Sequence, residues 1–200
     1  MDYIVETRSP VFKKTLEFCQ KVASSDANVL LIGESGTGKE IAANYIHQLS
    51  RRSSKDFVAV NCSAFTESLL ESELFGHEQG SFTGATKSRE GKIQTASGGT
   101  LFLDEIGDTS FSTQIKLLRV IETKYVDRIG SSAPRYIDFR LISATNRNLG
   151  EAIETAVFRE DFFYRISTIV IRIPSLRERM EDLNLLIPFF LKRAETVHGK

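Results

Sequence analysis

Short runs of apolar, largely β-branched residues alternate along the chain with longer segments in which apolar residues recur every three or four positions. The short runs predict five strands, at residues 29–32, 57–61, 100–104, 139–144 and 168–173. Each run is almost entirely apolar, which is typical of parallel strands covered by helices on both faces.

The longer segments predict four helices, near residues 12–23, 39–49, 65–74 and 112–123. In the last helix, one face runs through Ile115 and Leu118 to Glu122. Leu117 and Ile121 lie beside that face, and we expect this stripe to point into the core. Strands alternating with helices predict a doubly wound α/β fold with a parallel five-stranded sheet, whose ligands bind at the carboxyl ends of the strands.

Two segments interrupt this alternation. Residues 76–91 are polar and carry four glycines, which predicts a long insertion loop. Residues 125–140 predict a short hairpin that turns at 129–132. We expect both segments to belong to a single nucleotide-binding core that covers residues 1–174.

The composition changes after Pro174. A strongly charged stretch is followed by an apolar helix from Leu183 to about Val197. We expect residues 175–200 to form a linker and the first helix of a helical lid subdomain that is truncated at Lys200.

Composition and charge narrow the class of protein. Of 200 residues, 41% are hydrophobic and 26% are charged, as in ordinary globular domains, and the formal net charge is zero. A dedicated DNA-binding domain usually has a basic excess, so we expect DNA contact only through a domain absent here. Cys19 and Cys62 have no metal-binding spacing, and neither a signal peptide nor a membrane-spanning apolar run is present. These features favour a soluble, cytoplasmic protein without membrane contact.

A glycine-rich stretch directly follows the first strand and opens a helix: Gly33, Glu34, Ser35, Gly36, Thr37, Gly38, Lys39 and Glu40. Glycines let the backbone N–H groups wrap around phosphates, and the lysine reaches the β and γ phosphates. An ordinary strand-to-helix turn would explain the glycines but not Lys39 at this spacing. Glu40 stands where this motif usually has Ser or Thr to bind Mg²⁺, so the metal must rely on other groups.

Those groups follow the third strand. Asp104 and Glu105 end an apolar run, and this pattern is typical of a site in which Asp104 holds Mg²⁺ while Glu105 orients or deprotonates the attacking water. The alternative is that the two acids cap the following turn. Together with the phosphate loop, they favour hydrolysis of ATP.

Two amides follow other strands. Asn146 comes at the end of the fourth strand, where its side chain can contact the γ-phosphate and the water, although an Asn after a strand is often a turn residue. Asn61 ends the second strand and is a candidate to hold Glu105 when the site is idle.

Arg159 and Arg165 lie six residues apart on a predicted helix, far along the chain from the phosphate loop. They are suited to act as arginine fingers on the nucleotide of a neighbouring subunit. Surface ion pairing with Glu160 and Asp161 is an equally good interpretation of their spacing.

The insertion carries a short glycine-flanked stretch: Gly80, Ser81, Phe82, Thr83, Gly84 and Ala85. An exposed aromatic residue beside a hydroxyl is suited to contact a partner, whereas the alternative is a packed loop tip.

Six stretches occur in order along the chain: GESGTGKE, ESELFGHE, GSFTGA, GGTLFLDE, SATN and FREDFFYR. Over nearly all 200 residues, the chain resembles the central AAA+ P-loop NTPase domain of bacterial enhancer-binding proteins, the activators of sigma-54 RNA polymerase. The resemblance implies that Phe82 and Thr83 contact sigma-54, that ATP hydrolysis opens the promoter complex, and that the subunits form hexameric rings. It also implies that Glu40 is compatible with activity, that Arg159 and Arg165 act in trans, and that Asn61 is the partner of Glu105.

In the same family, residues near Val5 line the adenine pocket, and the hairpin at 125–140 is a second loop near the target. Ser81 stands where the family's loop usually has Ala. Two other functions compete with this one: an AAA+ motor with another protein target, and a nucleotide-gated scaffold that binds partners without turnover. The first alternative does not explain the GSFTGA loop. The second does not explain why Lys39, Asp104 and Glu105 are all present.

Overall fold

The computed structural model describes residues 6–81, 85–131 and 133–198. Its main sheet consists of β1 (Val29–Ile32), β2 (Phe57–Asn61), β5 (Thr100–Asp104), β8 (Arg140–Thr145) and β9 (Ile169–Arg172). All five strands are parallel, in the order β2-β5-β8-β1-β9, so the predicted sheet is confirmed. β8 is shifted by one residue from its predicted position, and β9 is one residue shorter at each end.

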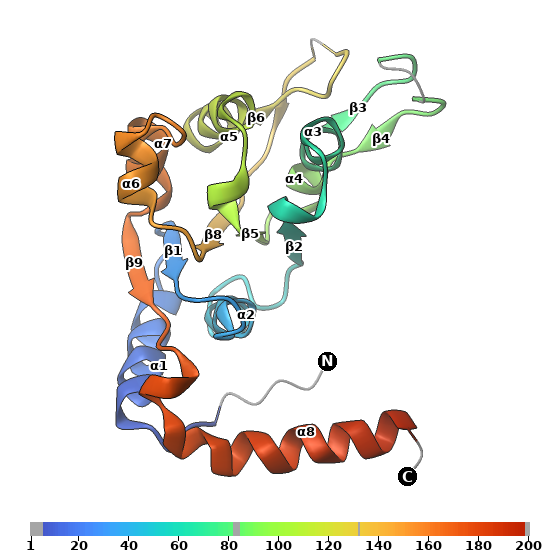
Figure 1. The fold of residues 1–200 in the computed structure, drawn as a ribbon. Helices are drawn as coiled ribbons and strands as arrows, with labels where there is room; N and C mark the ends of the chain where they lie inside the picture. Colours follow the sequence, from blue (N-terminus) through green and yellow to red (C-terminus); the bar gives the residue numbers. More distant parts are fainter. Residues whose placement is uncertain (1–5, 82–84, 132, 199–200) are drawn as a thin grey trace.

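Helices cover both faces of this sheet: α1 (Pro10–Ala23), α2 (Lys39–Gln48), α3 (Glu67–Phe75), α4 (Lys92–Thr95), α5 (Phe111–Thr123), α6 (Leu149–Glu154) and α7 (Glu160–Ile166). Figure 1 shows α1 and α2 on one side and the other five helices on the opposite side. Alternate residues of a strand serve the two layers, because successive side chains point to opposite faces. In β1, Leu30 packs with α3 and α5, whereas Val29 and Leu31 pack with α1 and α2.

The buried face of α5 agrees with the predicted one at Leu117 and Ile121 and differs from it at Ile115 and Glu122. Ile115 is 46% exposed, and the buried stripe instead includes Gln114, Leu117, Val120 and Ile121. A polar residue can occupy this stripe because its carboxamide is fully used: Gln114 donates to the carbonyls of two other loops.

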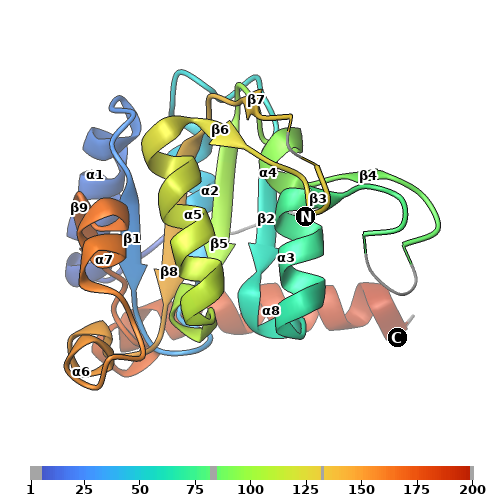
Figure 2. The same ribbon diagram turned by 90° about the horizontal axis from the view of Figure 1, so that it is seen from above.

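Four short strands form two antiparallel ribbons: β3 (Gly76–His77) with β4 (Arg89–Glu90), and β6 (Tyr125–Val126) with β7 (Arg135–Tyr136). The first pair closes the base of the predicted insertion loop, and the second lies within the predicted hairpin. The two ribbons are joined, since Ile129 donates to the Gly76 carbonyl and Glu78 donates to the Ile129 carbonyl, both at 3.0 Å. Figure 2 shows them side by side along one edge of the molecule.

Single 3₁₀ turns complete the chain at Cys62–Ala64, Ile106–Asp108, Leu176–Glu178 and Met180–Asp182. The last helix, α8 (Leu183–His198), starts near α1 and runs past α2 across the width of the sheet (Figure 1). Its Ile187, Phe190 and Leu191 are exposed. The division into a core at 1–174 and a second unit from 175 stays a prediction. Among the described residues, no helix is long and apolar enough to cross a membrane.

A buried arginine links the sheet to α1. Arg140, at the start of β8, is 1% exposed. Its guanidinium donates to the carbonyls of Val22 at 2.9 Å and Ala23 at 3.0 Å, at the C-terminal end of α1. Burial lowers the pKa of Arg140 below its ordinary value.

Candidate active site

The phosphate loop, residues 33–38, leads from the end of β1 into α2. Gly33 donates to the Thr145 carbonyl at 3.2 Å, so the loop starts against the end of β8. A side chain at Gly33 is excluded, because its Cβ would lie 2.9 Å from the Ile173 carbonyl oxygen. Gly36 and Gly38 have φ angles of 77° and 90°, a conformation that favours glycine. The glycines are therefore required by the path of the backbone.

This backbone presents free donors. The N–H groups of Gly36, Gly38 and Lys39 make no hydrogen bond with any residue that the structure describes, and Lys39 is also the first residue of α2. Unused N–H groups at a helix N-terminus attract anions, because the helix dipole adds positive potential there. The loop therefore has the donor set expected of an anion site.

The side chain of Lys39 is buried under this loop. Its Nζ donates to the carbonyls of Gly33 at 3.0 Å and Glu34 at 3.2 Å. Nζ also lies 3.5 Å from Glu105 Oε1, and both side chains are largely buried. The phosphate loop and the acidic strand end, separated in the sequence, are thus brought together.

The two acids lie at the carboxyl end of β5. Glu105 has a φ of 50°, which is uncommon for a residue other than glycine and is frequent at functional sites. Its N–H donates to Asp104 Oδ1 at 3.0 Å. Burial, and then the neighbouring charge of Glu105, raise the pKa of Asp104 above its ordinary value. A cation beside Asp104 would relieve both effects.

The amide candidates take different positions around these acids. The backbone N–H of Asn146 donates to Glu105 Oε2 at 3.1 Å, while its side chain is exposed. Asn61 pairs with Asp104 across neighbouring strands. Its carboxamide oxygen accepts from the N–H of Ser63 at 2.9 Å, and Glu105 is held by Lys39 and Asn146 instead. The role of Asn61 as a partner of Glu105 stays a prediction.

Arg159 is held on the surface of α5. Its guanidinium donates to both carboxylate oxygens of Asp161, at 2.9 and 2.6 Å, and lies 4.9 Å from the centre of the Phe111 ring. Its backbone N–H donates to Gln114 at 2.9 Å. The hydrogen bonds from Arg159 lower the pKa of Asp161. The ion pair with Asp161 expected from the spacing is therefore present. The guanidinium of Arg159 is half-buried and is fixed by this ion pair and by the Phe111 ring.

Arg165 is exposed and belongs to the opposite end of the sheet from the phosphate loop. Its carbonyl accepts from Asn28 at 2.8 Å, and Asn28 directly precedes β1, whereas Gly33 directly follows that strand. Those two positions are about 16 Å apart along an extended strand, farther than an arginine side chain extends.

The insertion stretch is described on both sides of its centre. Gly80 donates to the Ala85 carbonyl at 2.9 Å, which closes the loop at its neck. Ser81 lies against Gly130 of the neighbouring hairpin, where an added Cβ would meet the Ser81 Cβ at 2.8 Å. Phe82, Thr83 and Gly84 lie outside the described residues, as does Val5.

Beside the phosphate loop is a cavity of about 180 Å³. Residues from α1, the loop, the segment that precedes α8 and α8 itself line it, among them Phe12, Gly36, Leu176, Arg179 and Phe190. It is mostly apolar and continuous with the free N–H groups of the loop.

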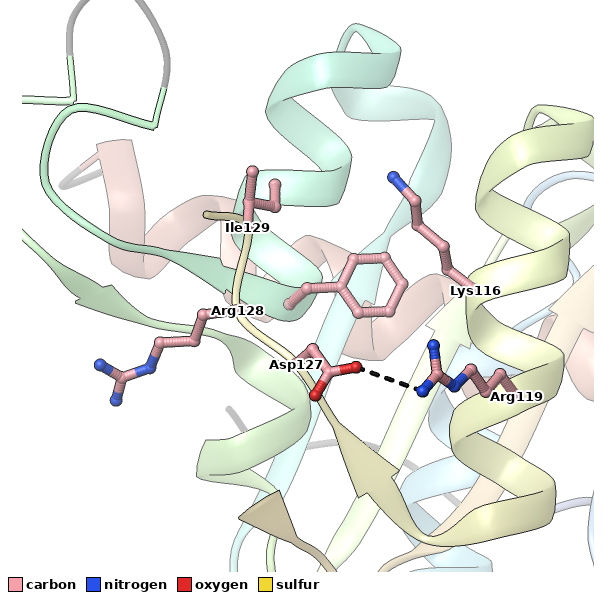
Figure 3. A pocket seen from close by; sticks show the side chains of 6 residues that line it. Lys116, Arg119, Asp127, Arg128 and Ile129 are labelled. Atoms are coloured by element: carbon pink, nitrogen blue, oxygen red, sulfur yellow. Dashed lines mark ion pairs between the residues drawn. The ribbon is translucent and has the colours of Figure 1, made fainter. Parts of the chain in front are cut away.

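A second cavity, of about 240 Å³, lies at the base of the two ribbons. Its walls are Phe75, Lys116, Arg119, Asp127, Arg128 and Ile129. In Figure 3, Lys116 and Arg119 extend from α5, and Asp127 faces Arg119 in an ion pair of 3.6 Å. Arg128 points away from this cavity, toward its carboxylate partner Glu78. This cavity is separate from the phosphate loop.

Sequence reasoning missed two residues that hold this site together. Gln114 accepts from the N–H of Arg159, and Arg179 donates to the Thr37 carbonyl in the loop. Neither has a local signal, since Gln114 lies within a helical pattern and Arg179 within a charged stretch.

A parallel α/β sheet with a phosphate loop after β1 and paired acids after β5 defines a P-loop NTPase domain of the AAA+ class. The chain belongs to the sigma-54 interaction domain family, whose model matches residues 5–172. It is 51% identical over 194 residues to the transcriptional regulatory protein GlrR of Escherichia coli, covering 97% of this chain and 44% of GlrR.

The structural relatives agree. NtrX from Brucella abortus superposes with a TM-score of 0.92 at 35% identity, over 97% of this chain and 44% of NtrX. NtrX in complex with ATP gives 0.89 at 34% identity, over the same shares. The P-loop NTPase domain of a sigma-54 activator from E. coli matches at a TM-score of 0.57 and 23% identity, over 86% of this chain and 99% of that one, which shows the fold alone. The chain thus spans less than half the length of GlrR and NtrX.

Proposed function

We propose that this chain binds ATP with Mg²⁺, hydrolyses it within a ring of identical subunits, and uses the reaction to remodel sigma-54 RNA polymerase so that the promoter complex opens. The observation that carries this proposal is the Nζ of Lys39, buried under the phosphate loop and 3.5 Å from Glu105. This arrangement joins a phosphate-binding group to a candidate base.

The hydrogen-bond donors of the phosphate loop fit a nucleotide. Free N–H groups at Gly36, Gly38 and Lys39 suit the phosphates, and the apolar cavity beside Gly36 is large enough to accept part of a base. ATP in the related NtrX structure supports the same ligand.

The acids fit magnesium. Mg²⁺ usually takes one or two carboxylates and completes its shell with water and phosphate oxygens. Asp104 offers such a carboxylate, and no larger cluster of acidic, histidine or cysteine ligands occurs among the described residues. Bound there, the ion would neutralise phosphate charge.

Lys39, Glu105 and Asn146 would have different roles in hydrolysis. Lys39 would leave its loop carbonyls and donate to the phosphates, which weakens its attraction to Glu105. Glu105, released on one side and still held by the N–H of Asn146, would orient the attacking water and take its proton. Asn146 would contribute its exposed side chain to the γ-phosphate.

Arg159 and Arg165 would act on the neighbouring subunit's nucleotide. Arg165 lies too far from its own phosphate loop, and Arg159 is attached to α5 rather than to the loop. A site completed by a second copy requires a head-to-tail ring, and the hexamer of the family meets that requirement.

Residues 80–85 would contact sigma-54. Gly80 and Ala85 close the neck of this loop, and its base is bonded to the hairpin at Ile129. A displacement of one ribbon would therefore move the other.

Thr83→Ala tests whether hydrolysis and remodelling are separate. The substitution removes no phosphate or metal contact, so phosphate release should stay within about threefold of wild type, whereas a central contact in a small interface carries much of the binding. Capture of sigma-54 by the full chain, with a transition-state mimic of ATP, should be lost. Thr86→Ala, just past the loop, is the matched control and should capture normally. Normal capture by Thr83→Ala would refute the loop as the contact, and absence of phosphate release by wild type would refute the ATPase.

A further inference from the structure

Arg179 connects three elements that meet at the phosphate loop. It lies between the two 3₁₀ turns that precede α8, and only 8% of it is exposed. Its Nη2 donates to the Thr37 carbonyl at 2.6 Å, and its guanidinium carbon lies 4.2 Å from the centre of the Phe12 ring. A charged group is costly to bury, and the pKa of Arg179 is lowered by that burial. These contacts offset the cost.

The hydrogen bond to Thr37 fixes the direction of a phosphate-loop donor. The carbonyl of Thr37 and the N–H of Gly38 belong to one planar trans peptide unit, so they point in opposite directions. Because the Thr37 carbonyl points toward Arg179, the Gly38 N–H points away from Arg179. Gly38 has a φ of 90° and no side chain to restrict this unit, so a hydrogen bond from Arg179 can select its orientation.

The start of α8 is attached to α1 by the same turn. Asp182 is 2% exposed and accepts from the hydroxyl of Thr7 at 2.8 Å, the N–H of Arg8 at 2.7 Å and the N–H of Ser9 at 3.2 Å. It therefore serves the N-terminal end of α1, where Ser9 makes no side-chain cap. With Asp182 fixed to α1, Arg179 makes a buried contact between the segment that precedes α8 and the loop, and the exposed Arg177 also pairs with Glu34 of the loop.

We propose that Arg179 is a positioning residue: through the Thr37 carbonyl it orients the Gly38 N–H toward a bound phosphate, and it thereby makes the seating of α8 depend on nucleotide. This inference rests on the proposed ATP site. A phosphate that engages Gly38 polarises the peptide unit and strengthens the bond to Arg179, so nucleotide and α8 stabilise one another.

The test uses Arg179→Met in the full chain, which keeps the length of the side chain over Phe12 and removes the donor. Arg193→Met, on the exposed part of α8, is the matched control. Calorimetry should show ATP binding about three- to tenfold weaker in Arg179→Met and unchanged in the control. Hydrogen exchange should show nucleotide-dependent protection of residues 183–190 in wild type and in the control, and none in Arg179→Met.

The change in protection on adding ATP separates positioning from simple support, since a merely structural role would loosen α8 equally with and without ATP. Arg179→Lys, which keeps a charged donor, should restore part of both effects, and it carries the test if Arg179→Met fails to fold. If Arg179→Met binds ATP as tightly as wild type and shows the wild-type protection of α8, the proposal is overturned. If only Arg179→Lys folds, the same wild-type result in that variant overturns the proposal. Absence of ATP binding by wild type would instead overturn the ATP site itself.

Discussion

Arg165→Ala and Lys39→Ala should each abolish hydrolysis but for different reasons, and mixing them should restore it. The first variant keeps an intact phosphate loop and lacks the arginine offered to its neighbour. The second lacks the buried lysine that contacts the loop carbonyls and Glu105, and keeps its arginine. Arg165 lies at the amino end of β1 and the loop at the carboxyl end, so under the proposed function a working site would combine Arg165 of one subunit with the phosphate loop of another.

The expected rates of the variants and of their mixture follow from the proposed ring. An arginine finger contributes about 10³ in rate or more, so Arg165→Ala alone should run at about 0.1% of wild type or below. Lys39→Ala alone should show no hydrolysis, because its phosphate loop lacks the lysine. In a one-to-one mixture, half of the pockets are intact and half of the neighbouring arginines are present, so about a quarter of the interfaces of a head-to-tail ring are complete. Phosphate release should therefore recover to about a quarter of the wild-type rate.

The assay is steady-state phosphate release over a series of mixing ratios, with mixed rings verified by co-purification through a tag on one variant. The control replaces Arg165→Ala by the double variant Lys39→Ala/Arg165→Ala, whose pockets are all defective, and no mixture with it should recover. If the single variants show no recovery at any ratio while mixed rings are present, Arg165 does not act between subunits, and the reasoning from its distance fails.

Two further predictions concern stability. His47 is buried, with Nδ1 2.9 Å from the Thr100 hydroxyl, and burial lowers its pKa in the folded chain below the ordinary value of about 6.5. The unfolded state therefore binds more protons, so the stabilising contribution of neutral His47 is complete above about pH 6.5 and falls as the pH drops below it. Urea unfolding at pH 7.5 and 5.5 should show a smaller loss of stability at the lower pH in His47→Gln than in wild type. Arg140→Met leaves the Ala23 carbonyl at the end of α1 without its donor, so thermal or urea unfolding should show a loss of about 1–3 kcal/mol, and an unchanged midpoint would mean that the buried guanidinium contributes nothing net.

The sequence alone determined the strands and the phosphate loop. Parallel strands buried on both faces leave unbroken apolar runs, so β1, β2 and β5 begin and end at their predicted residues. The motif of the loop is equally local, since its glycines and Lys39 lie within eight consecutive residues. Membership of the family rests on the same local stretches and is confirmed.

Only the tertiary structure decided which side chains meet. Gln114 is buried on α5 because its partners come from other loops, and no helical period reveals them. Arg179 and Thr37 are 142 residues apart, and Glu105 accepts from the N–H of Asn146, 41 residues away. Periodicity reports which face of an element is buried on average, whereas hydrogen-bond partners depend on how elements pack. For this reason the chemical groups of the site could be predicted from the sequence, and the contacts that orient them could not.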